Sequence, residues 1–355
     1  MCRLLGYCAR GEVPLTRLLG DQEFRDFTAL SALHSDGWGM AWYEAGQPRI
    51  RKSPHCAGGT PEYHELARRP LGDLGLLHLR WATPGLGVND RNSHPFRYGP
   101  YVLAHNGAIH PQDRLPELLP PEWERQLAGT TDSERYCLGI MSRLAAHGNE
   151  MAHDSDMVTA ITDTAADIDR RFLPNSLNAI LLSPARLYAI NWHDPARVPA
   201  AQLRQRGYGD RPDEIAAYFD LAYRITDQAV VVASSGWPQP GWTPLPNRNV
   251  LVIDRATLKL SVVPLNPQSP PGPLPGGMQS PALPPAGTRG RHRLEAESRC
   301  SATAARCCSI SRTPARSCRR ERASAATIAT ASRIAIPAAN ATASSASFRI
   351  CMSIM

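Results

Sequence analysis

The chain of 355 residues has no long apolar run, and no stretch approaches the ~18–20 apolar residues of a membrane-spanning helix. It also lacks a secretory signal peptide, because the short apolar stretch after Arg3 is broken by Gly6, Arg10 and Gly11. These absences argue against a membrane protein and against an exported one. We therefore expect a cytoplasmic protein with no membrane partner.

The cysteines lack the spacing of a zinc site. Four of the nine precede residue 265, and these four, Cys2, Cys8, Cys56 and Cys137, are far apart. In a cytosolic chain such cysteines are reduced thiols, so we expect the last three to be ordinary packed side chains. We expect neither a metal site nor an organic cofactor.

Residues 266–355 contain no lysine, tryptophan or tyrosine. Pro and Gly dominate residues 266–290, which predicts an extended linker, and the Ala/Ser/Arg/Thr-rich remainder offers too little apolar surface for a core. Twelve of the 39 basic residues but only three of the 32 acidic ones lie in 266–355, so this segment carries +9 and the rest of the chain −2 of the net charge of +7. We expect one domain over 2–265, then a linker and a disordered tail, which an out-of-frame reading of the gene would also explain. An arginine-rich nucleic-acid arm is the alternative, and the lack of interleaved aromatic residues argues against it.

Apolar runs and periodicity predict a mixture of strands and helices over 2–265. The strand candidates are Leu4–Ala9, Gly39–Tyr43, Leu76–Ala82, Tyr101–Ala104, Ala179–Leu182, Leu187–Asn191, Ala229–Ala233, Val250–Ile253 and Leu258–Val263. The helix candidates are Val13–Gly20, Pro61–Arg69, Asp132–Ala146, Met157–Phe172 and Pro212–Tyr223. Runs of strands are interrupted by pairs of helices, which favours antiparallel sheets covered by helices over a doubly wound parallel sheet.

Cys2 is the most informative single residue, because methionine before a small residue is commonly removed. Removal of Met1 would give Cys2 a free α-amine beside its own thiol. The amine titrates near pH ~7.7–8.0 and the thiol near ~8.5, so the two groups can exchange a proton close to neutrality. One residue could then supply both nucleophile and base. Taken alone, a cysteine here is more often a small buried residue that begins a strand.

Four further stretches place polar residues beside Gly or Pro at the expected ends of strands and helices, where chemistry is usually presented. They are His34–Trp42, Leu77–Gly85, Ser93–Phe96 followed by His105–Gly107, and Thr130–Glu134. Each has a plainer explanation by itself. Arg80 could form a surface ion pair, and Asn106-Gly107 is typical of a tight hairpin turn. Asp132 could simply begin a helix, because Thr131 followed three residues later by Glu134 is a capping-box pattern. Their joint occurrence in this order favours a site.

Together with Cys2, these stretches resemble the glutaminase domain of the class II glutamine amidotransferases, which are N-terminal nucleophile hydrolases. The resemblance runs from Cys2 to about Glu134 and more loosely to Pro264. It implies an α+β fold of four layers, αββα, with two antiparallel sheets packed face to face and helices outside. The chain is most similar to short, stand-alone members, including those that remove γ-glutamyl groups in ergothioneine biosynthesis or glutathione breakdown.

The resemblance also implies a role for each residue. Cys2 would attack the γ-carboxamide carbon of glutamine or of a γ-glutamyl compound and form a thioester. The side chain of Asn106 and the backbone N–H of Gly107 would stabilise the oxyanion. Arg80 would bind the substrate α-carboxylate through two hydrogen bonds, and Asp132 would bind the α-ammonium. The pocket would be shaped by Trp81, Thr83, His94, Asp36 and Gly37.

Two features depart from members that are fused to a synthase. Pro84 stands where many of them have a second histidine, and no synthase domain is visible after residue 265. The first hypothesis is therefore a stand-alone amidohydrolase. The alternatives are a glutaminase subunit that supplies ammonia to a separate synthase, and a non-catalytic γ-glutamyl-binding module.

Overall fold

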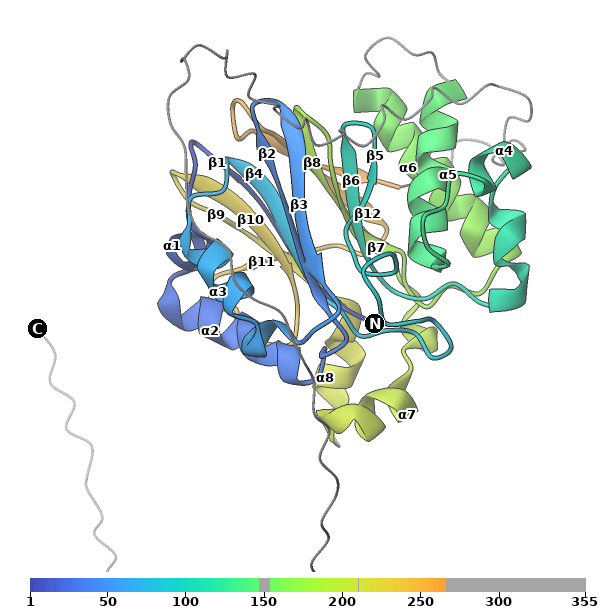
Figure 1. Cartoon of the computed structure of the whole chain (residues 1–355), viewed down its shortest axis with the longest axis horizontal. Helices are drawn as coiled ribbons and strands as arrows, with labels where there is room; N and C mark the ends of the chain where they lie inside the picture. Colours follow the sequence, from blue (N-terminus) through green and yellow to red (C-terminus); the bar gives the residue numbers. More distant parts are fainter. Residues whose placement is uncertain (147–153, 210, 266–355) are drawn as a thin grey trace, which may run out of the picture. The chain divides into compact units, whose positions relative to one another are not determined.

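The computed structural model describes residues 1–146, 154–209 and 211–265, so the predicted linker and tail at 266–355 lie outside the described residues. Within this part, the strands form a seven-stranded sheet in the order β11-β9-β10-β1-β4-β2-β3 and a six-stranded sheet in the order β13-β12-β8-β7-β6-β5. Neighbouring strands are antiparallel in both sheets. Figure 1 shows the two sheets face to face with helices on their outer sides.

The strands and helices have these bounds. The first sheet contains β1 (Arg3–Ala9), β2 (Trp38–Glu44), β3 (Gln47–Ser53), β4 (Leu74–Leu79), β9 (Leu221–Ile225), β10 (Ala229–Ser234) and β11 (Thr243–Leu245). The second contains β5 (Phe96–Tyr98), β6 (Tyr101–Asn106), β7 (Asn178–Leu182), β8 (Arg186–Asn191), β12 (Asn249–Asp254) and β13 (Leu260–Pro264). The α-helices are α1 (Leu15–Leu19), α2 (Asp21–Ala29), α3 (Pro61–Arg68), α4 (Pro121–Glu124), α5 (Asp132–Ala146), α6 (Asp154–Arg171), α7 (Ala200–Leu203) and α8 (Pro212–Ala216). None of the helices in the described ranges is both long and apolar enough to cross a bilayer.

Strand β1 shows how side-chain alternation builds the layers. Leu5 and Tyr7 belong to the core formed with α1, α2 and α3, whereas Leu4 and Cys8 belong to the core between the two sheets. Gly6 also faces the second sheet, because a Cβ at this residue would lie 2.9 Å from side-chain atoms of both Ile180 and Leu187. A third core joins the outer face of the second sheet to α5 and α6. The predicted four-layer sandwich is confirmed.

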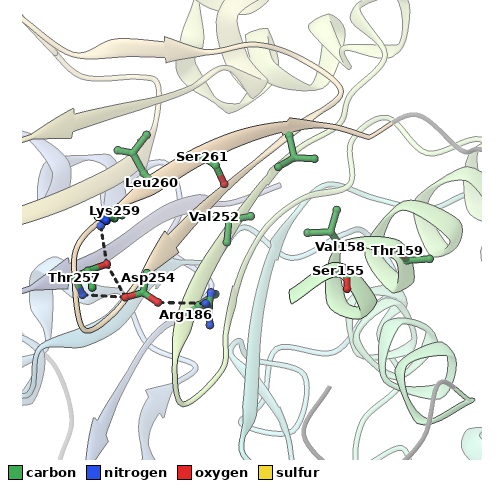
Figure 2. A pocket seen from close by; sticks show the side chains of 11 residues that line it. Ser155, Val158, Thr159, Arg186, Val252, Asp254, Thr257, Lys259, Leu260 and Ser261 are labelled. Atoms are coloured by element: carbon green, nitrogen blue, oxygen red, sulfur yellow. Dashed lines mark hydrogen bonds and ion pairs between the residues drawn. The ribbon is translucent and has the colours of Figure 1, made fainter. Parts of the chain in front are cut away.

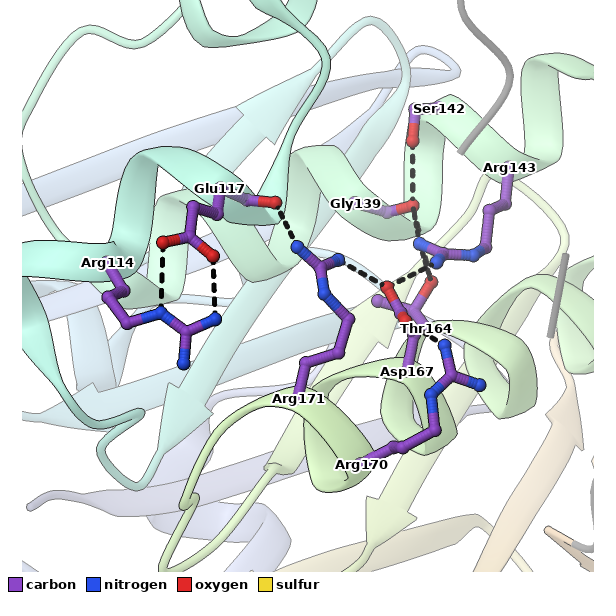
Figure 3. A network of polar contacts seen from close by, with 9 residues as sticks. All are labelled: Arg114, Glu117, Gly139, Ser142, Arg143, Thr164, Asp167, Arg170 and Arg171. Atoms are coloured by element: carbon purple, nitrogen blue, oxygen red, sulfur yellow. Dashed lines mark hydrogen bonds and ion pairs between the residues drawn. The ribbon is translucent and has the colours of Figure 1, made fainter. Parts of the chain in front are cut away.

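Helix α5 is fixed on α6 by a buried ion pair (Figure 3). Arg143 of α5 donates to Asp167 of α6 at 3.0 Å, and Arg170 and Arg171 donate to the same carboxylate at 2.7 and 2.9 Å. Arg143 and Asp167 are only 7% and 5% exposed, so the loss of Asp167 would leave the Arg143 charge buried without its carboxylate partner. Because α5 begins at Asp132, this network also fixes the helix that presents a predicted site residue.

The predicted strands and helices differ from the observed ones mainly where tertiary contacts determine the secondary structure. All nine predicted strands are present, and α5 has the predicted bounds. The predicted helix over Pro212–Tyr223 is wrong in its second half, because α8 ends at Ala216 and β9 begins at Leu221. Strands β3, β5, β9 and β11 were not expected. They are short or lie at or next to a sheet edge, and β3 carries Pro48 and five cationic or polar residues that hide its alternation.

Candidate active site

The thiol and the amide of the predicted site come from two different sheets. Cys2 directly precedes β1 in the first sheet, and Asn106 ends β6 in the second. The Cys2 backbone N–H donates to Asn106 Oδ1 at 2.6 Å, and both residues are buried. This contact leaves the side-chain NH₂ of Asn106 as the free end, and it has no hydrogen-bond partner among the described residues. A buried donor of this kind suits an oxyanion.

Gly107 follows Asn106 and lines the same cavity as Cys2. A Cβ at Gly107 would lie 1.9 Å from the carbonyl oxygen of Ser176, so any other residue would require the backbone at Ser176, just before β7, to shift. The Asn106-Gly107 pair is not the loop of a hairpin. Strand β6 pairs with β7 through residues more than seventy positions later in the chain. The simple turn explanation is therefore wrong.

Arg80 and Asp132 place one cation and one anion at this cavity. Arg80 follows β4, and its guanidinium donates to the carbonyl oxygens of Asp36 at 3.4 Å and Gly87 at 3.1 Å. Burial lowers the pKa of Arg80, although a guanidinium stays charged at neutral pH. The Asp132 carboxylate accepts from the backbone N–H groups of Ile109 and Ser133, each at 2.9 Å. Hydrogen bonds to backbone atoms therefore hold the Arg80 guanidinium and the Asp132 carboxylate in place, and both residues line the cavity.

The start of α5 explains why Asp132 is so well placed. Thr131 Oγ1 accepts from the backbone N–H of Glu134 at 3.1 Å, which is the predicted helix cap. The Glu134 carboxylate instead accepts from the N–H groups of Ala128 and Gly129, each at 2.8 Å. Half of the predicted capping box is therefore present, and its acidic half fixes the loop before the helix.

Met1 fills the cavity in this structure. Its ammonium donates to the Trp81 carbonyl oxygen at 2.6 Å, and burial lowers the pKa of this amine. Only about 20 Å³ of free volume remains, which is room for about one water molecule. The lining residues are Met1, Cys2, Arg80, Trp81, Ala82, Thr83, Leu86, Asn92, His94, Gly107, Thr131, Asp132 and Ser133.

Asp36 and Gly37 lie behind the cavity and are not among its lining residues. The Asp36 carboxylate accepts from the backbone N–H of Ala82 at 2.9 Å and from Arg206 at 3.1 Å. Gly37 has a φ of 133°, and a Cβ there would lie 2.7 Å from the Ser53 carbonyl oxygen. Both residues therefore shape the loop that carries Arg80 rather than offering a free group to a ligand.

Trp81, Thr83 and His94 line the cavity. The Trp81 carbonyl oxygen also lies 3.7 Å from Cys2 Sγ, so this residue contacts the thiol through its backbone. Pro84, the departure noted in the sequence, does not line the cavity, and its carbonyl oxygen accepts from Gln112 at 3.4 Å. Arg80 is the arginine among the residues that line the cavity.

The thiol also lies beside two histidines. Cys2 Sγ and one ring nitrogen from each of His78 and His94 lie within 4.8 Å of one another, and all three residues are buried. The rings contact each other, with 2.5 Å between His94 Nδ1 and His78 Nε2. Burial lowers the pKa of both rings well below the ordinary value, so both are neutral near pH 7. A thiolate and two neutral imidazoles are the ligands of a soft cation such as Zn²⁺.

The chain is similar in sequence to a known protein family. Residues 1–209 match the family described as "Glutamine amidotransferases class-II". The chain belongs to the class-II glutamine amidotransferases. It is therefore an enzyme that acts on C–N bonds in linear amides, as the motifs predicted.

Individual relatives agree with this assignment. The amidotransferase is 28% identical over 193 residues to a gamma-glutamyl-hercynylcysteine sulfoxide hydrolase of Mycobacterium tuberculosis, covering 51% of this chain and 73% of that protein. It is 32% identical over 140 residues to a glutamine–fructose-6-phosphate aminotransferase (isomerizing) of Clostridium tetani, covering 38% of this chain and 21% of that protein. A solved class-II glutamine aminotransferase domain protein from Silicibacter pomeroyi aligns with a TM-score of 0.50 and 19% identity, over 75% of this chain and all of that chain. This last likeness supports the fold alone.

Several residues of the amidotransferase site were not predicted from the sequence. Asn92 lines the cavity and accepts from the backbone N–H of Thr130 at 2.9 Å. Arg206 packs over the Trp81 ring, with 5.1 Å between its guanidinium carbon and the ring centroid. His34 contacts the Met1 carbonyl oxygen at 3.3 Å. Arg206 has no sequence signal for such a role, because the residues that it contacts lie more than a hundred positions away in the chain.

Two other hollows of the amidotransferase have no asparagine among their lining residues, so neither offers an amide beside a thiol. One of about 730 Å³ lies between α6 and the β12–β13 hairpin (Figure 2), and its lining residues include neither cysteine nor histidine. There Asp254 pairs with Arg186 at 3.3 Å. The other, of about 650 Å³, is lined by residues including Cys56 and His64, which bond to the carbonyl oxygens of Ser31 and Gly58. The cavity at Cys2 is therefore the better candidate.

Proposed function

We propose that the enzyme hydrolyses the γ-carboxamide of glutamine or of a γ-glutamyl amide, with Cys2 as the nucleophile and a γ-glutamyl thioester as intermediate. One observation carries the proposal. A single cavity is lined by Cys2, Arg80 and Asp132, and Asn106, whose side-chain NH₂ has no partner among the described residues, accepts from the Cys2 backbone N–H. An amino-acid head needs one fixed cation and one fixed anion, and a scissile amide needs a nucleophile and an oxyanion donor.

The first half of the reaction forms the thioester. The α-amine of the mature Cys2 takes the thiol proton, and the thiolate sulfur attacks the γ-carbon. Asn106 Nδ2 and the Gly107 N–H donate to the oxyanion, and a donor of this kind contributes ~3–4 kcal/mol in related chemistry. The C–N bond then breaks, and the leaving nitrogen takes the proton from the α-ammonium of Cys2.

The second half restores the enzyme. Water attacks the thioester carbon while the α-amine takes one of its protons, and the sulfur leaves as the thiolate. The thiolate regains that proton, and the glutamyl product departs as a carboxylic acid that loses its remaining proton to solvent. Arg80 and Asp132 hold the α-carboxylate and α-ammonium throughout, so the γ-carbon stays beside the sulfur.

Removal of Met1 is part of the proposal. While Met1 is present, the Cys2 nitrogen is an amide that cannot act as a base, and Met1 lines the cavity with its ammonium bound to the Trp81 carbonyl oxygen. We expect protein that retains Met1 to be inactive. Intact-mass measurement beside an activity assay tests this, and ordinary turnover by Met1-retaining protein would contradict it.

A stand-alone hydrolase is the reading that we favour. The match to the gamma-glutamyl-hercynylcysteine sulfoxide hydrolase covers 73% of that protein, whereas the match to the aminotransferase covers 21% of that protein. We therefore expect γ-glutamyl compounds of this class to be better substrates than glutamine. A glutaminase subunit that delivers ammonia to a separate synthase is the second candidate, motivated by the aminotransferase relative.

A substrate screen separates these proposals. Purified protein without Met1 is incubated with glutamine, γ-glutamyl peptides and γ-glutamyl thiol metabolites, and released glutamate is measured by mass spectrometry. Cys2→Ala is the inactive control, and Cys56→Ala is the matched control because Cys56 lies outside the cavity. Hydrolysis that persists in Cys2→Ala would refute the mechanism. Glutamine turnover that rises only with an added synthase would favour the second candidate.

A further inference from the structure

His34 is a buried side chain that the proposed mechanism leaves unused. It is 0% exposed and lies just before β2. Its ring centroid lies 6.1 Å from that of Trp81 and 6.5 Å from those of both Tyr208 and Tyr218. Three aromatic neighbours hold the ring in one orientation. His34 can therefore present a ring nitrogen to a fixed position.

The hydrogen bonds of His34 assign its proton. Nδ1 lies 3.3 Å from the Met1 carbonyl oxygen, and Nε2 lies 3.1 Å from the Tyr208 hydroxyl. A carbonyl oxygen only accepts, so Nδ1 carries the hydrogen while Met1 is in place, and Nε2 accepts from Tyr208. Burial, and then the nearby Arg3, lower the pKa of His34 well below its ordinary value, in keeping with a neutral ring.

Removal of Met1 takes away the oxygen that His34 binds. The Cys2 nitrogen becomes a primary amine, and by peptide geometry it lies ~2.3 Å from the place of that oxygen. The amine has two N–H groups, and Asn106 Oδ1 already accepts one of them at 2.6 Å. Its second N–H needs an acceptor in this buried site, and His34 Nδ1 faces the vacated position.

We propose that His34 is a positioning residue for the mature α-amine and accepts its second N–H through Nδ1, directly or through one water. This inference rests on the proposed function, which makes the amine the base. The ring proton moves to Nε2 and is donated to the Tyr208 hydroxyl, which can accept as well as donate, so no net proton is gained or lost. With its N–H groups held by Asn106 and His34, the amine directs its lone pair to the thiol.

The test compares His34→Leu with His34→Asn in the full chain, after intact mass has confirmed loss of Met1. Asparagine offers a carbonyl oxygen close to the place of Nδ1, whereas leucine offers no acceptor. We expect His34→Leu to lower kcat ~10- to 100-fold, the range of one positioned proton-transfer group, with KM within about twofold. His34→Asn should recover most of the loss.

The second readout is the alkylation rate of Cys2 by iodoacetamide, followed on the Cys2 peptide by mass spectrometry. An acceptor on the amine stabilises the ammonium form and therefore the ammonium–thiolate pair. We expect His34→Leu to move the half-maximal rate to higher pH and His34→Asn to restore it. The charged and titratable groups that face His34 and the amine remain unchanged in both variants: Arg3, His78, Arg80, Asp132, Tyr208 and Tyr218.

The control is His193→Leu, which removes another buried ring whose Nδ1 contacts Asn191 and which does not line the cavity. It should change neither readout. Wild-type kcat and alkylation profile in folded His34→Leu would overturn the inference. If that variant does not fold, Tyr208→Phe removes the hydroxyl at Nε2, and an unshifted profile there overturns it too. Hydrolysis by Cys2→Ala would instead overturn the proposed function.

Discussion

Three buried histidines should make the fold sensitive to mild acid. His34, His78 and His94 are at most 4% exposed, and burial lowers the pKa of each well below 6.5. Arg3 adds to the effect at His34, and Arg80 adds to it at both other rings. In the unfolded chain each ring titrates near ~6.5, so the unfolded state binds more protons below that pH. Stability is therefore full above ~6.5 and is lost as the pH falls.

The size of the effect follows from linkage. Between pH ~7.5 and ~5.5 a histidine that stays neutral in the folded state loses ~1.4 kcal/mol of stability, so three lose ~4 kcal/mol. This is a large fraction of the ~5–15 kcal/mol that stabilises a typical domain. Urea unfolding at several pH values measures the loss directly.

Single variants assign the loss to its source. In His94→Asn the loss between these two pH values should shrink by ~1.4 kcal/mol, because one titrating ring is gone. His55→Asn, on an exposed side chain, should leave it unchanged. A free energy of unfolding that differs by less than ~1 kcal/mol between the two pH values would refute the reasoning.

The other predictions concern the site and its support. Arg80→Lys should raise KM ~10- to 100-fold, because lysine cannot make two parallel hydrogen bonds to a carboxylate, whereas exposed Arg68→Lys should not; an unchanged KM counts against the role of Arg80. Asp167→Asn should lower the free energy of unfolding in urea by ~3–5 kcal/mol, because Arg143 loses its buried carboxylate partner. Glu117→Gln, in an exposed ion pair, should lower it by under ~1 kcal/mol, and equal losses in the two variants would contradict this. Zn²⁺ should inhibit hydrolysis reversibly through Cys2, His78 and His94, and His94→Asn should weaken that inhibition roughly tenfold; identical inhibition of both proteins would exclude these ligands.

Local sequence signals predicted the elements whose own residues determine them. Helix α5 has a capping threonine and a continuous apolar face, and its bounds match the expectation. Strand β3 has the opposite character. Its residues are mostly polar or charged, and it is a strand because it pairs with β2 along its whole length. Pairing of this kind depends on the partner strand, which the segment's own sequence does not contain.

The site divides in the same way. Cys2, Arg80, Gly107 and Asp132 were predicted together from motifs, and the structure brings them to one cavity. Asp36 was expected to shape the pocket, and its carboxylate is occupied by Arg206 from a segment 170 positions away. Arg206 has no motif of its own, so no local pattern indicated it. Contacts between segments that are distant in the chain could not be predicted from local sequence patterns.

The burial of the N-terminus links maturation to substrate access. Met1 is 5% exposed, its ammonium binds the Trp81 carbonyl oxygen and its own carbonyl oxygen accepts from His34. The proposed function needs a free α-amine and a bound substrate in this region. Because Met1 lines the cavity and only about 20 Å³ is left, a chain that keeps Met1 has no space for an amino acid there. Under that proposal, removal of Met1 both creates the base and opens the cavity to substrate.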